Sequence, residues 1–197
     1  MEEKEIRERL KNYDTWFNYP SFYTMVAERK SFTRYVEIGV WKGEAISFLA
    51  NLLRDRENLE LYGVDLFENS TIPKYYPDLN NIINDTHDMY TLYNFNLVDK
   101  NVRHLIKDIK GCSWEVAKQF EDKYFDFIYI DAGHSYEEVY KDVTAWLPKI
   151  KNTGILAGHD TKASDIIRAT TEVLGNKIKI WPKRNEDVWY VDFGGMN

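Results

Sequence analysis

Acidic residues follow the first two short apolar runs of the sequence, at points where a turn could hold a ligand. Glu37 opens the first turn, Glu37-Ile38-Gly39-Val40-Trp41-Lys42-Gly43, and Asp65 ends the second run. A carboxylate such as Glu37 repels a diphosphate but pairs well with a cation such as an amino group or a sulfonium. Asp65 comes roughly 20 residues after this turn, the distance at which nucleotide-binding folds place the acid that binds a ribose. The two residues therefore indicate a ribose-bearing ligand with a positively charged end.

The glycines of the first turn are spaced G-x-x-x-G. Dinucleotide folds instead use G-x-G-x-x-G, where a helix N-terminus holds a pyrophosphate. Gly39 and Gly43 let the backbone pass close to a ligand. A ligand with a ribose, a cationic end and no phosphate is S-adenosylmethionine, which we expect as the cofactor. Its expected contacts in this part of the chain are Glu37, Gly39, Val40, Trp41, Gly43 and Asp65.

A second group of polar residues follows two later apolar runs. Asp131-Ala132-Gly133-His134 comes after residues 125–130, and Gly158-His159-Asp160 comes after residues 154–157. Neighbouring strands lie about 4.8 Å apart, so the two groups could converge. Two carboxylates and an imidazole suit Mg²⁺, Mn²⁺ or Fe²⁺, and such an ion would lower the pKa of a bound substrate hydroxyl. The expected ligands of a divalent metal are Asp131, His159 and Asp160.

The same residues also fit catalysis without a metal. His159 or His134 could act as the general base that takes the proton from a hydroxyl. We slightly favour this alternative, because only one carboxylate stands directly at each strand end and His134 precedes the helix-capping Ser135. In either case the expected catalytic residues are Asp131, His134 and His159.

The elements that must position these residues alternate along the chain. Short β-branched or aromatic runs alternate with amphipathic segments, which predicts an α/β fold with a doubly wound, mostly parallel seven-stranded sheet. The expected strands are residues 34–38, 60–64, 102–107, 125–130, 154–157, 177–180 and 187–193. The expected helices are residues 44–53, 113–120 and 164–174, and one that starts at the S-x-x-E capping box of Ser135 and Glu138 and stops at Pro148.

The last two strands should form an antiparallel hairpin. The sequence Asn152-Thr153-Gly154 predicts a turn before the fifth strand. Only residues 181–186 separate the last two strands. Six residues are too few for a crossover helix, so the pair cannot be parallel.

Composition narrows the function classes. The chain has 197 residues, a net charge of −6, one cysteine and no apolar run of membrane-spanning length. We therefore expect a single, cytoplasmic domain over residues 1–197, without a disulfide framework, which associates with neither nucleic acid nor membrane and could form a homo-oligomer. Residues 1–33 and 66–101 are rich in aromatic side chains and lack sheet periodicity, which predicts an N-terminal lid and a lid insertion.

Three segments resemble the class I S-adenosylmethionine-dependent methyltransferases: VEIGVWKGEA, GVDLF and DFIYIDAGHSYEEVYKDVTAWLPKIKNTGILAGHD. The resemblance covers about residues 34–193 and points to a small bacterial subgroup that includes cephalosporin-hydroxylase-like and macrolide-sugar O-methyltransferases. It implies a Rossmann-like methyltransferase fold and transfer of a methyl group to oxygen.

The resemblance also implies roles for individual residues. Glu37 and residues 39–43 would surround the methionine part of the cofactor, and Asp65 would hold the ribose. Cys112 and Ser113 would lie near the adenine, although the subgroup usually has an acidic residue where this chain has Cys112. Asp131 would stand at the boundary between cofactor and substrate, and metal-dependent relatives bind a divalent ion with acidic residues after the fourth and fifth strands.

Several acceptors and functions remain open from the sequence. A sugar hydroxyl or another small-molecule hydroxyl is the expected acceptor, and a phenol or catechol is the alternative. A dinucleotide-dependent oxidoreductase is disfavoured by Glu37 and by the missing G-x-G-x-x-G. A binding module that kept the fold without catalysis is a third class, and the intact residues at the strand ends argue against it.

Overall fold

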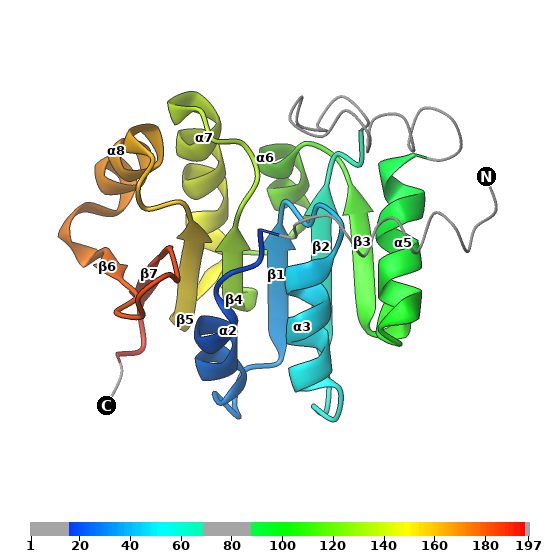
Figure 1. Ribbon diagram of the computed structural model, residues 1–197. Coiled ribbons are helices and arrows are strands. Elements are labelled where there is room, and N and C mark those ends of the chain that lie inside the picture. Colours follow the sequence, from blue (N-terminus) through cyan, green and yellow to red (C-terminus); the bar gives the residue numbers. More distant parts are fainter. Residues whose placement is uncertain (1–15, 69–87, 196–197) are drawn as a thin grey trace.

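One mixed sheet of seven strands organises the part of the chain that the structure describes. The structure is a computed structural model, and it describes residues 16–68 and 88–195. The strand order is β3-β2-β1-β4-β5-β7-β6 (Figure 1). The strands are Arg34–Ile38 (β1), Glu60–Asp65 (β2), Ile106–Lys110 (β3), Phe125–Ile130 (β4), Ile150–His159 (β5), Lys179–Ile180 (β6) and Val188–Asp192 (β7). The predicted α/β sheet is confirmed.

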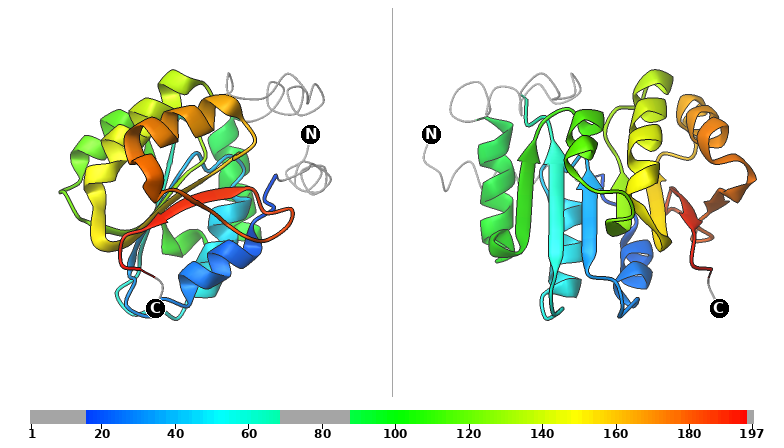
Figure 2. Two further views of the ribbon diagram at one scale, coloured as in Figure 1. Left: turned by 90° about the vertical axis from the view of Figure 1, so that its left-hand side faces the viewer. Right: turned by 180° about the vertical axis from the view of Figure 1, so that it is seen from behind.

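Helices cover both faces of this sheet, as the end-on view of Figure 2 shows. On one face lie Pro20–Ala27 (α2), Glu44–Leu53 (α3) and Met89–Asp99 (α5), and on the other lie Ser113–Val116 (α6), Tyr136–Trp146 (α7) and Ser164–Leu174 (α8). Each face has its own apolar cluster, because a central parallel strand such as β4 buries side chains in both directions. The predicted capping box of Ser135 and Glu138 begins α7.

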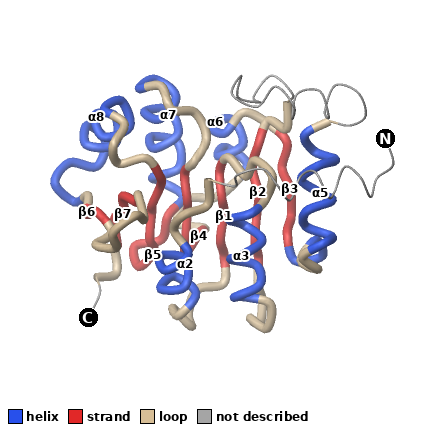
Figure 3. The backbone as a smooth tube through the Cα atoms, viewed as in Figure 1, coloured by secondary structure: helices blue, strands red, loops and turns tan. Residues whose placement is uncertain are grey.

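The parallel strands bring the predicted site residues to one edge. Strands β1 to β5 are all parallel to their neighbours in the order β3-β2-β1-β4-β5. Their carboxyl ends therefore open into loops at the same edge of the sheet, which Figure 3 shows in tan. Ligands of open α/β sheets bind at this edge.

Three strands differ clearly from the prediction. The sixth was expected at residues 177–180, but Gly175–Lys177 form a 3₁₀ turn and β6 is only Lys179–Ile180. The third strand was expected at residues 102–107, but residues Arg103–Leu105 form a 3₁₀ turn and β3 starts at Ile106. In β3 only Ile106 is buried, whereas Lys107 and Lys110 are exposed, as is typical of an edge strand, so its sequence has no long apolar run. The fifth strand starts at Ile150, so the predicted turn at residues 152–154 lies inside it, next to a register shift opposite residues 125–127.

The C-terminal hairpin is confirmed. Strand β7 pairs antiparallel with β5 on one side and with β6 on the other, so it is inserted between them.

None of the helices within residues 16–68 and 88–195 is long and apolar enough to cross a membrane.

Several aromatic residues of the two predicted lid segments are buried against the sheet, whereas Trp16 and Tyr90 are exposed. Phe22 and Tyr23 of α2 are fully buried, and so is Tyr93 of α5. These helices are therefore covering elements of the sheet, because they bury their aromatic faces against it. Of the predicted lids, residues 1–15 and 69–87 lie outside the described residues.

Candidate functional site

A cleft of about 890 Å³ runs along the carboxyl edge of the sheet. Its walls come from the loops after β1, β2, β3, β4 and β5 and from the segment before α2. Of the predicted site residues, it is lined by Glu37, Gly39, Val40, Trp41, Asp65, Cys112, Ser113, Asp131, His134, His159 and Asp160. Its size suits a small-molecule ligand.

The two glycines of the first turn are required by packing. A Cβ atom on Gly39 would lie 2.0 Å from the Asp131 carbonyl oxygen, and one on Gly43 would lie 2.9 Å from the Tyr93 ring. Both glycines also have positive φ angles, of +82° and +80°. Gly39 lines the cleft but Gly43 does not, because it starts α3 and lies under Tyr93. The explanation that both glycines serve close approach of a ligand therefore needs correction.

Asp65 organises the loop that follows β1. One of its carboxylate oxygens accepts hydrogen bonds from the backbone N–H groups of Val40 and Trp41, at 2.9 and 3.1 Å. The other accepts one from Phe67 N–H at 2.8 Å. Trp41 adopts a left-handed backbone conformation with φ +48°, which is unusual for a bulky side chain and is held in place by this bond. A carboxylate has about four acceptor positions, so Asp65 keeps capacity for a further donor from a ligand.

Glu37 is a buried carboxylate at the floor of the cleft. Glu37 is 2% exposed, and the Tyr23 hydroxyl donates a hydrogen bond of 2.8 Å to its Oε2. Burial raises the pKa of Glu37 well above its ordinary value, although the hydrogen bond from Tyr23 acts in the opposite direction. A buried acid of this kind gains from a cationic partner, because that partner restores the stability of its charged form.

Asp131 follows β4 and lines the cleft beside His134 and His159. The Tyr19 hydroxyl donates to its Oδ2 at 3.2 Å, and His159 Nδ1 lies 3.9 Å from its Oδ1. Burial raises the pKa of Asp131, while the charge of His159 opposes the increase.

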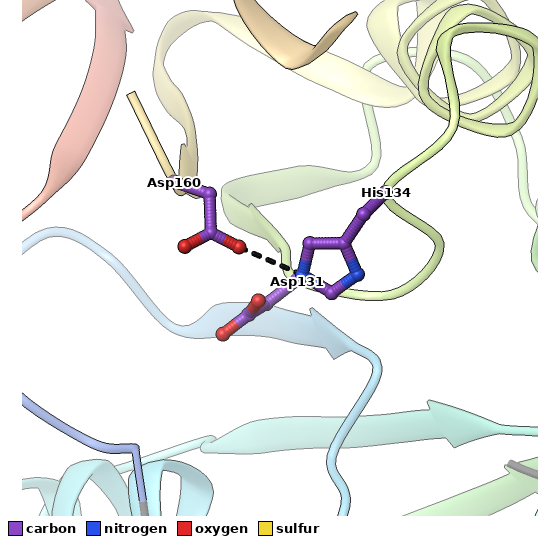
Figure 4. Close-up of side chains that lie close together, drawn as sticks. All are labelled: Asp131, His134 and Asp160. Carbon is purple, nitrogen blue, oxygen red and sulfur yellow. Dashed lines mark ion pairs between the residues drawn. The ribbon is translucent and has the colours of Figure 1, made fainter. Parts of the chain in front are cut away.

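Four titratable residues meet at the ends of β4 and β5. His134 Nε2 lies 2.7 Å from Asp160 Oδ2, and His159 Nδ1 lies 3.1 Å from Asp160 Oδ1 (Figure 4 shows the first pair). The predicted convergence of the two strand ends is present. One ligand atom from each of Asp131, His134 and Asp160 lies within 4.8 Å of the others. The set that could hold one cation thus contains His134 in place of the expected His159.

The protonation of this cluster follows from its mixed charges. The hydrogen bond to Asp160 raises the pKa of His134. The pKa of His159 is also raised, because Asp160 and Asp131 outweigh the opposing effect of its burial. Hydrogen bonds from both imidazoles in turn hold the pKa of Asp160 well below its ordinary value. An imidazole with a raised pKa is less available as a base near neutral pH, since a larger fraction of it already carries its proton.

Cys112 and Ser113 form the far end of the cleft, after β3. Cys112 is the N-cap residue of α6, and no side chain caps that helix start. The Ser113 hydroxyl is buried and accepts a hydrogen bond from Trp146 Nε1 at 2.8 Å. Ser113 is therefore fixed by α7.

Three residues of the site were not singled out by sequence reasoning. The Tyr19 hydroxyl donates to Asp131, which lies 112 residues later in the chain, and the Tyr23 hydroxyl donates to Glu37. No local sequence pattern predicts such contacts. Asp142 lines the cleft from α7. It did carry a signal, because it lies on the apolar face between Val139 and Val143, where a charged residue is unusual.

Comparisons with known proteins place the chain in a family. A family model described as "Methyltransferase domain" matches residues 36–161, which is more than half of the chain. A search of curated proteins found no match.

Solved structures with the same fold include several methyltransferases. The TDP-rhamnose 3′-O-methyltransferase CalS11 of calicheamicin biosynthesis is 16% identical, with a TM-score of 0.59 over 89% of this chain and 79% of its own. The O-methyltransferase NovP is 16% identical, with a TM-score of 0.61 over 87% and 78% of the two chains. A putative caffeoyl-CoA O-methyltransferase from Staphylococcus aureus is 12% identical, with a TM-score of 0.62 over 96% and 90%. With the family match, these findings show that the chain belongs to the methyltransferase domain family and is an enzyme of the S-adenosylmethionine-dependent methyltransferase class.

Proposed function

We propose that the cleft binds S-adenosylmethionine and that the enzyme transfers its methyl group to a hydroxyl oxygen of a small molecule. The observation that carries this proposal is the order of acidic groups along one edge of the sheet. Glu37 is at the end of β1, Asp65 at the end of β2, and Asp131 at the end of β4. The methionine part of the cofactor carries a cationic amino group, which needs an acid. The ribose hydroxyls need hydrogen-bond acceptors, and the hydroxyl that attacks the methyl group needs a group that handles its charge.

Each acid has one role in this proposal. The buried Glu37 binds the amino group of the cofactor, because a buried carboxylate gains most from a charged partner. Asp65 accepts from the ribose hydroxyls while it holds the turn at Val40 and Trp41. Cys112 and Ser113 flank the adenine.

The acceptor is a hydroxyl, and a sugar hydroxyl is the first choice. The name of CalS11 describes it as a 3′-O-methyltransferase of TDP-rhamnose, and NovP is an O-methyltransferase. A phenolic acceptor is the alternative, supported by the fold shared with the putative caffeoyl-CoA O-methyltransferase. The net charge of −6 disfavours nucleic acid as an acceptor.

We further propose that Asp131, His134 and Asp160 hold a divalent cation. Two carboxylates and one imidazole are donors that suit Mg²⁺ or Mn²⁺, and their ligand atoms are close enough for one ion. When bound, the ion would stabilise the negative charge of a substrate hydroxyl that has lost its proton. A metal ligand and a general base must both be unprotonated histidines, so the assignment depends on the convergence of the Asp131 and Asp160 carboxylates and not on the pKa of His134.

The protein residues then have to align the reactants. Methyl transfer is an in-line displacement, in which the oxygen forms a bond to carbon as the bond from carbon to sulfur breaks and leaves S-adenosylhomocysteine, while the proton of the hydroxyl is released to water. Asp131 faces both reactants in this proposal, since it lines the cleft with Glu37 and its Oδ1 lies 3.9 Å from His159 Nδ1. Tyr19 fixes the Asp131 carboxylate by a hydrogen bond. Alignment of this kind supplies a large part of the rate enhancement.

A methyl-transfer assay tests the proposal. The purified chain is incubated with labelled S-adenosylmethionine and either nucleotide-linked sugars or catechols, with Mg²⁺ and with a chelator. We expect label in a sugar hydroxyl, loss of activity with the chelator and its return with Mg²⁺ or Mn²⁺. Chelator-insensitive activity that rises with pH through the histidine range would overturn the cation assignment and support His134 or His159 as the base.

A further inference from the structure

The stretch of chain before α2 forms part of the cleft and reaches the proposed reaction centre. Residues 16–19 all line the cleft, and we call them the wall segment. The Tyr19 hydroxyl donates to Asp131 Oδ2 at 3.2 Å, and Asn18 Oδ1 lies 3.2 Å from His159 Nε2. The ring centroids of Tyr19 and His159 are 5.1 Å apart. The wall segment therefore contacts the side chains at the ends of β4 and β5.

The start of α2 has no cap from the residue that normally provides one. Tyr19 occupies the N-cap position, and its side chain makes no capping hydrogen bond. Serine, threonine, aspartate and asparagine are preferred at this position, because their side chains accept from the first free N–H groups of a helix. Tyr19 instead directs its hydroxyl to Asp131. Another element must therefore stabilise the helix start.

Glu186, in the loop between β6 and β7, supplies the missing cap. Its Oε1 accepts from Ser21 N–H at 3.1 Å, and its Oε2 accepts from Phe22 N–H at 3.1 Å and from the Ser21 hydroxyl at 2.8 Å. Trp181 of the same loop donates from Nε1 to the Ser21 hydroxyl oxygen at 3.1 Å, and its ring packs edge-on against Phe22. These contacts satisfy the free N–H groups of the helix start and attach it to the loop.

The same loop is attached to the chain that follows β5. Asp187, next to Glu186, accepts from the backbone N–H of Thr161 at 3.0 Å and also from the Thr161 hydroxyl. Thr161 directly follows Asp160, one of the proposed cation ligands. Two adjacent acids in residues 181–187 thus join the helix start that carries the wall segment to the loop that carries Asp160.

We propose that Glu186 is a positioning residue for methyl transfer, because by capping α2 it holds the Tyr19 hydroxyl against the Asp131 carboxylate. This inference rests on the proposed function, in which Asp131 takes part in the reaction. Glu186 does not line the cleft, so its effect has to pass through Tyr19, which directly precedes the capped turn. Such support matters, because a displacement of about 1 Å at a reacting group can lower a rate by roughly 100-fold.

The cofactor side of the cleft should depend little on Glu186. Tyr23, the α2 residue that contacts the proposed amine ligand Glu37, is fully buried within the packed helix. Asp65 is held by backbone N–H groups of other loops. Loss of the cap should therefore lower turnover and leave the affinity for the cofactor nearly unchanged. General unfolding would lower both.

The test compares Glu186→Gln with the wild type. Whichever way the amide turns, its NH₂ group faces the N–H of Ser21 or of Phe22, so one backbone contact is lost. Turnover is measured with labelled S-adenosylmethionine and the nucleotide-linked sugars and catechols of the methyl-transfer assay. Calorimetry gives the Kd for S-adenosylhomocysteine, and hydrogen exchange of the peptide that covers residues 16–23 reports on the wall segment.

Asp126→Asn is the matched control. Asp126 accepts from two backbone N–H groups, those of Thr33 and Arg34, as Glu186 does at α2. It lies near the start of β4, at the other end of this strand from Asp131, and does not line the cleft. This variant should lose stability but keep the turnover of the wild type.

We expect Glu186→Gln to lower kcat by roughly tenfold or more. The Kd for S-adenosylhomocysteine should stay within about threefold of the wild-type value. Exchange of residues 16–23 should be roughly tenfold faster, because the helix start opens more often. In a Tyr19→Phe background the same substitution should lower kcat by less than about threefold, since the contact that it supports is already missing.

If Glu186→Gln does not fold, Ser21→Ala is measured in the same way. This substitution removes one donor to Glu186 and leaves both backbone contacts, so a smaller loss of kcat, again dependent on the Tyr19 hydroxyl, is expected.

Three results would overturn the inference while leaving the proposed function intact. The first is a loss of kcat in Glu186→Gln no larger than in Asp126→Asn. The second is an equal loss with and without the Tyr19 hydroxyl, which would mean that Glu186 does not act through this residue. The third is unchanged hydrogen exchange of residues 16–23. A wild type that neither binds S-adenosylhomocysteine nor methylates an acceptor contradicts the proposed function itself, and the exchange measurement then shows separately whether Glu186 holds the wall segment.

Discussion

The acids at the ends of β2 and β4 are the same residue type at the same edge of the sheet, yet they are held in different ways. Asp65 accepts hydrogen bonds from three backbone N–H groups, at Val40, Trp41 and Phe67. Asp131 instead faces side chains that can lose or gain protons, namely Tyr19 and His159. Backbone donors are permanent, whereas the partners of Asp131 depend on pH and on what is bound.

In the proposed function, this difference separates an acid that shapes the site from an acid that takes part in the reaction. A carboxylate held by backbone donors shapes a loop and presents fixed acceptor positions to a ligand. A carboxylate among titratable side chains can exchange its partners for a cation or a substrate. We therefore expect substitutions at the two strand ends to separate stability and binding from turnover.

The largest effect is expected for Asp131→Asn. Turnover should fall by roughly 10²–10⁴-fold, as for the loss of a group that handles the charge or the proton of a reacting hydroxyl. The dissociation constant for S-adenosylhomocysteine should stay within a few-fold of the wild-type value, because Glu37 and Asp65 are unchanged. Kinetics and calorimetry on the same preparation measure both quantities.

Asp165→Asn, a half-exposed acid at the start of α8, is the control for this experiment and should behave as the wild type. Near-normal turnover in both Asp131→Asn and His159→Ala would place the active site elsewhere.

The opposite pattern is expected for Asp65→Ala. The free energy of unfolding should fall by roughly 1–3 kcal/mol, because buried backbone N–H groups lose their acceptor. Binding of S-adenosylhomocysteine should weaken by a similar roughly 1–3 kcal/mol, through the lost ribose contact and the relaxed turn at Trp41. Chemical denaturation and calorimetry provide the two numbers. An unchanged affinity would contradict the ribose assignment of Asp65.

The sequence predicted these strand-end acids because each one directly follows a short run of buried residues. The same reasoning located β1, β4, α3 and α8 at their observed bounds. It misplaced β3, since residues Arg103–Leu105 form a 3₁₀ turn and the true edge strand carries exposed lysines at Lys107 and Lys110. Hydrophobic patterns in the sequence predict which residues are buried. An edge strand buries too few of its residues for such a pattern to predict it.

What the sequence could not predict is which side chains complete the site. The contact between Tyr19 and Asp131 joins residues 112 positions apart, and it depends on how α2 packs against the sheet. The role of Gly43 was misjudged for the same reason, because the Tyr93 ring that excludes its Cβ comes from α5. Long-range packing decides these contacts, and no spacing rule contains it.

A smaller effect is expected on the pH dependence of cofactor binding, which depends on Glu37, the acid at the end of β1. Because the pKa of Glu37 is raised in the empty cleft, its carboxyl keeps a proton to higher pH than usual. A ligand amino group favours the ionised form, so affinity for S-adenosylhomocysteine should fall as the pH is lowered through this raised pKa. Calorimetry between pH 5.5 and 8.5, values chosen to bracket the range around neutrality, follows the change.

Glu37→Gln should weaken binding and flatten this pH profile. It should not lower the thermal stability, because an acid with a raised pKa loses stability as the pH rises above its ordinary pKa, and the amide has no such loss. A variant that binds with wild-type affinity and the same pH profile would show that Glu37 does not face the ligand amine.

The smallest effect is expected for His134→Gln on stability. The raised pKa of His134 means that its pairing with Asp160 stabilises the fold fully below the ordinary histidine pKa, and this contribution is lost as the pH rises through the raised value. The side chain is 59% exposed, so the loss at pH 6 should stay below about 1 kcal/mol. Denaturation at pH 6 and pH 9 should give a larger difference between variant and wild type at pH 6. A loss that grows toward pH 9 would contradict the direction of this shift.

The most direct test of the account is a calorimetric titration of the wild-type chain with S-adenosylhomocysteine, with NAD as the comparison ligand. The acidic wall of Glu37 and Asp65 predicts binding of S-adenosylhomocysteine in the micromolar range, about −8 kcal/mol, and no binding of the diphosphate-containing NAD. Binding of NAD without binding of S-adenosylhomocysteine would contradict the assignment of the cleft to a methyl-donor cofactor.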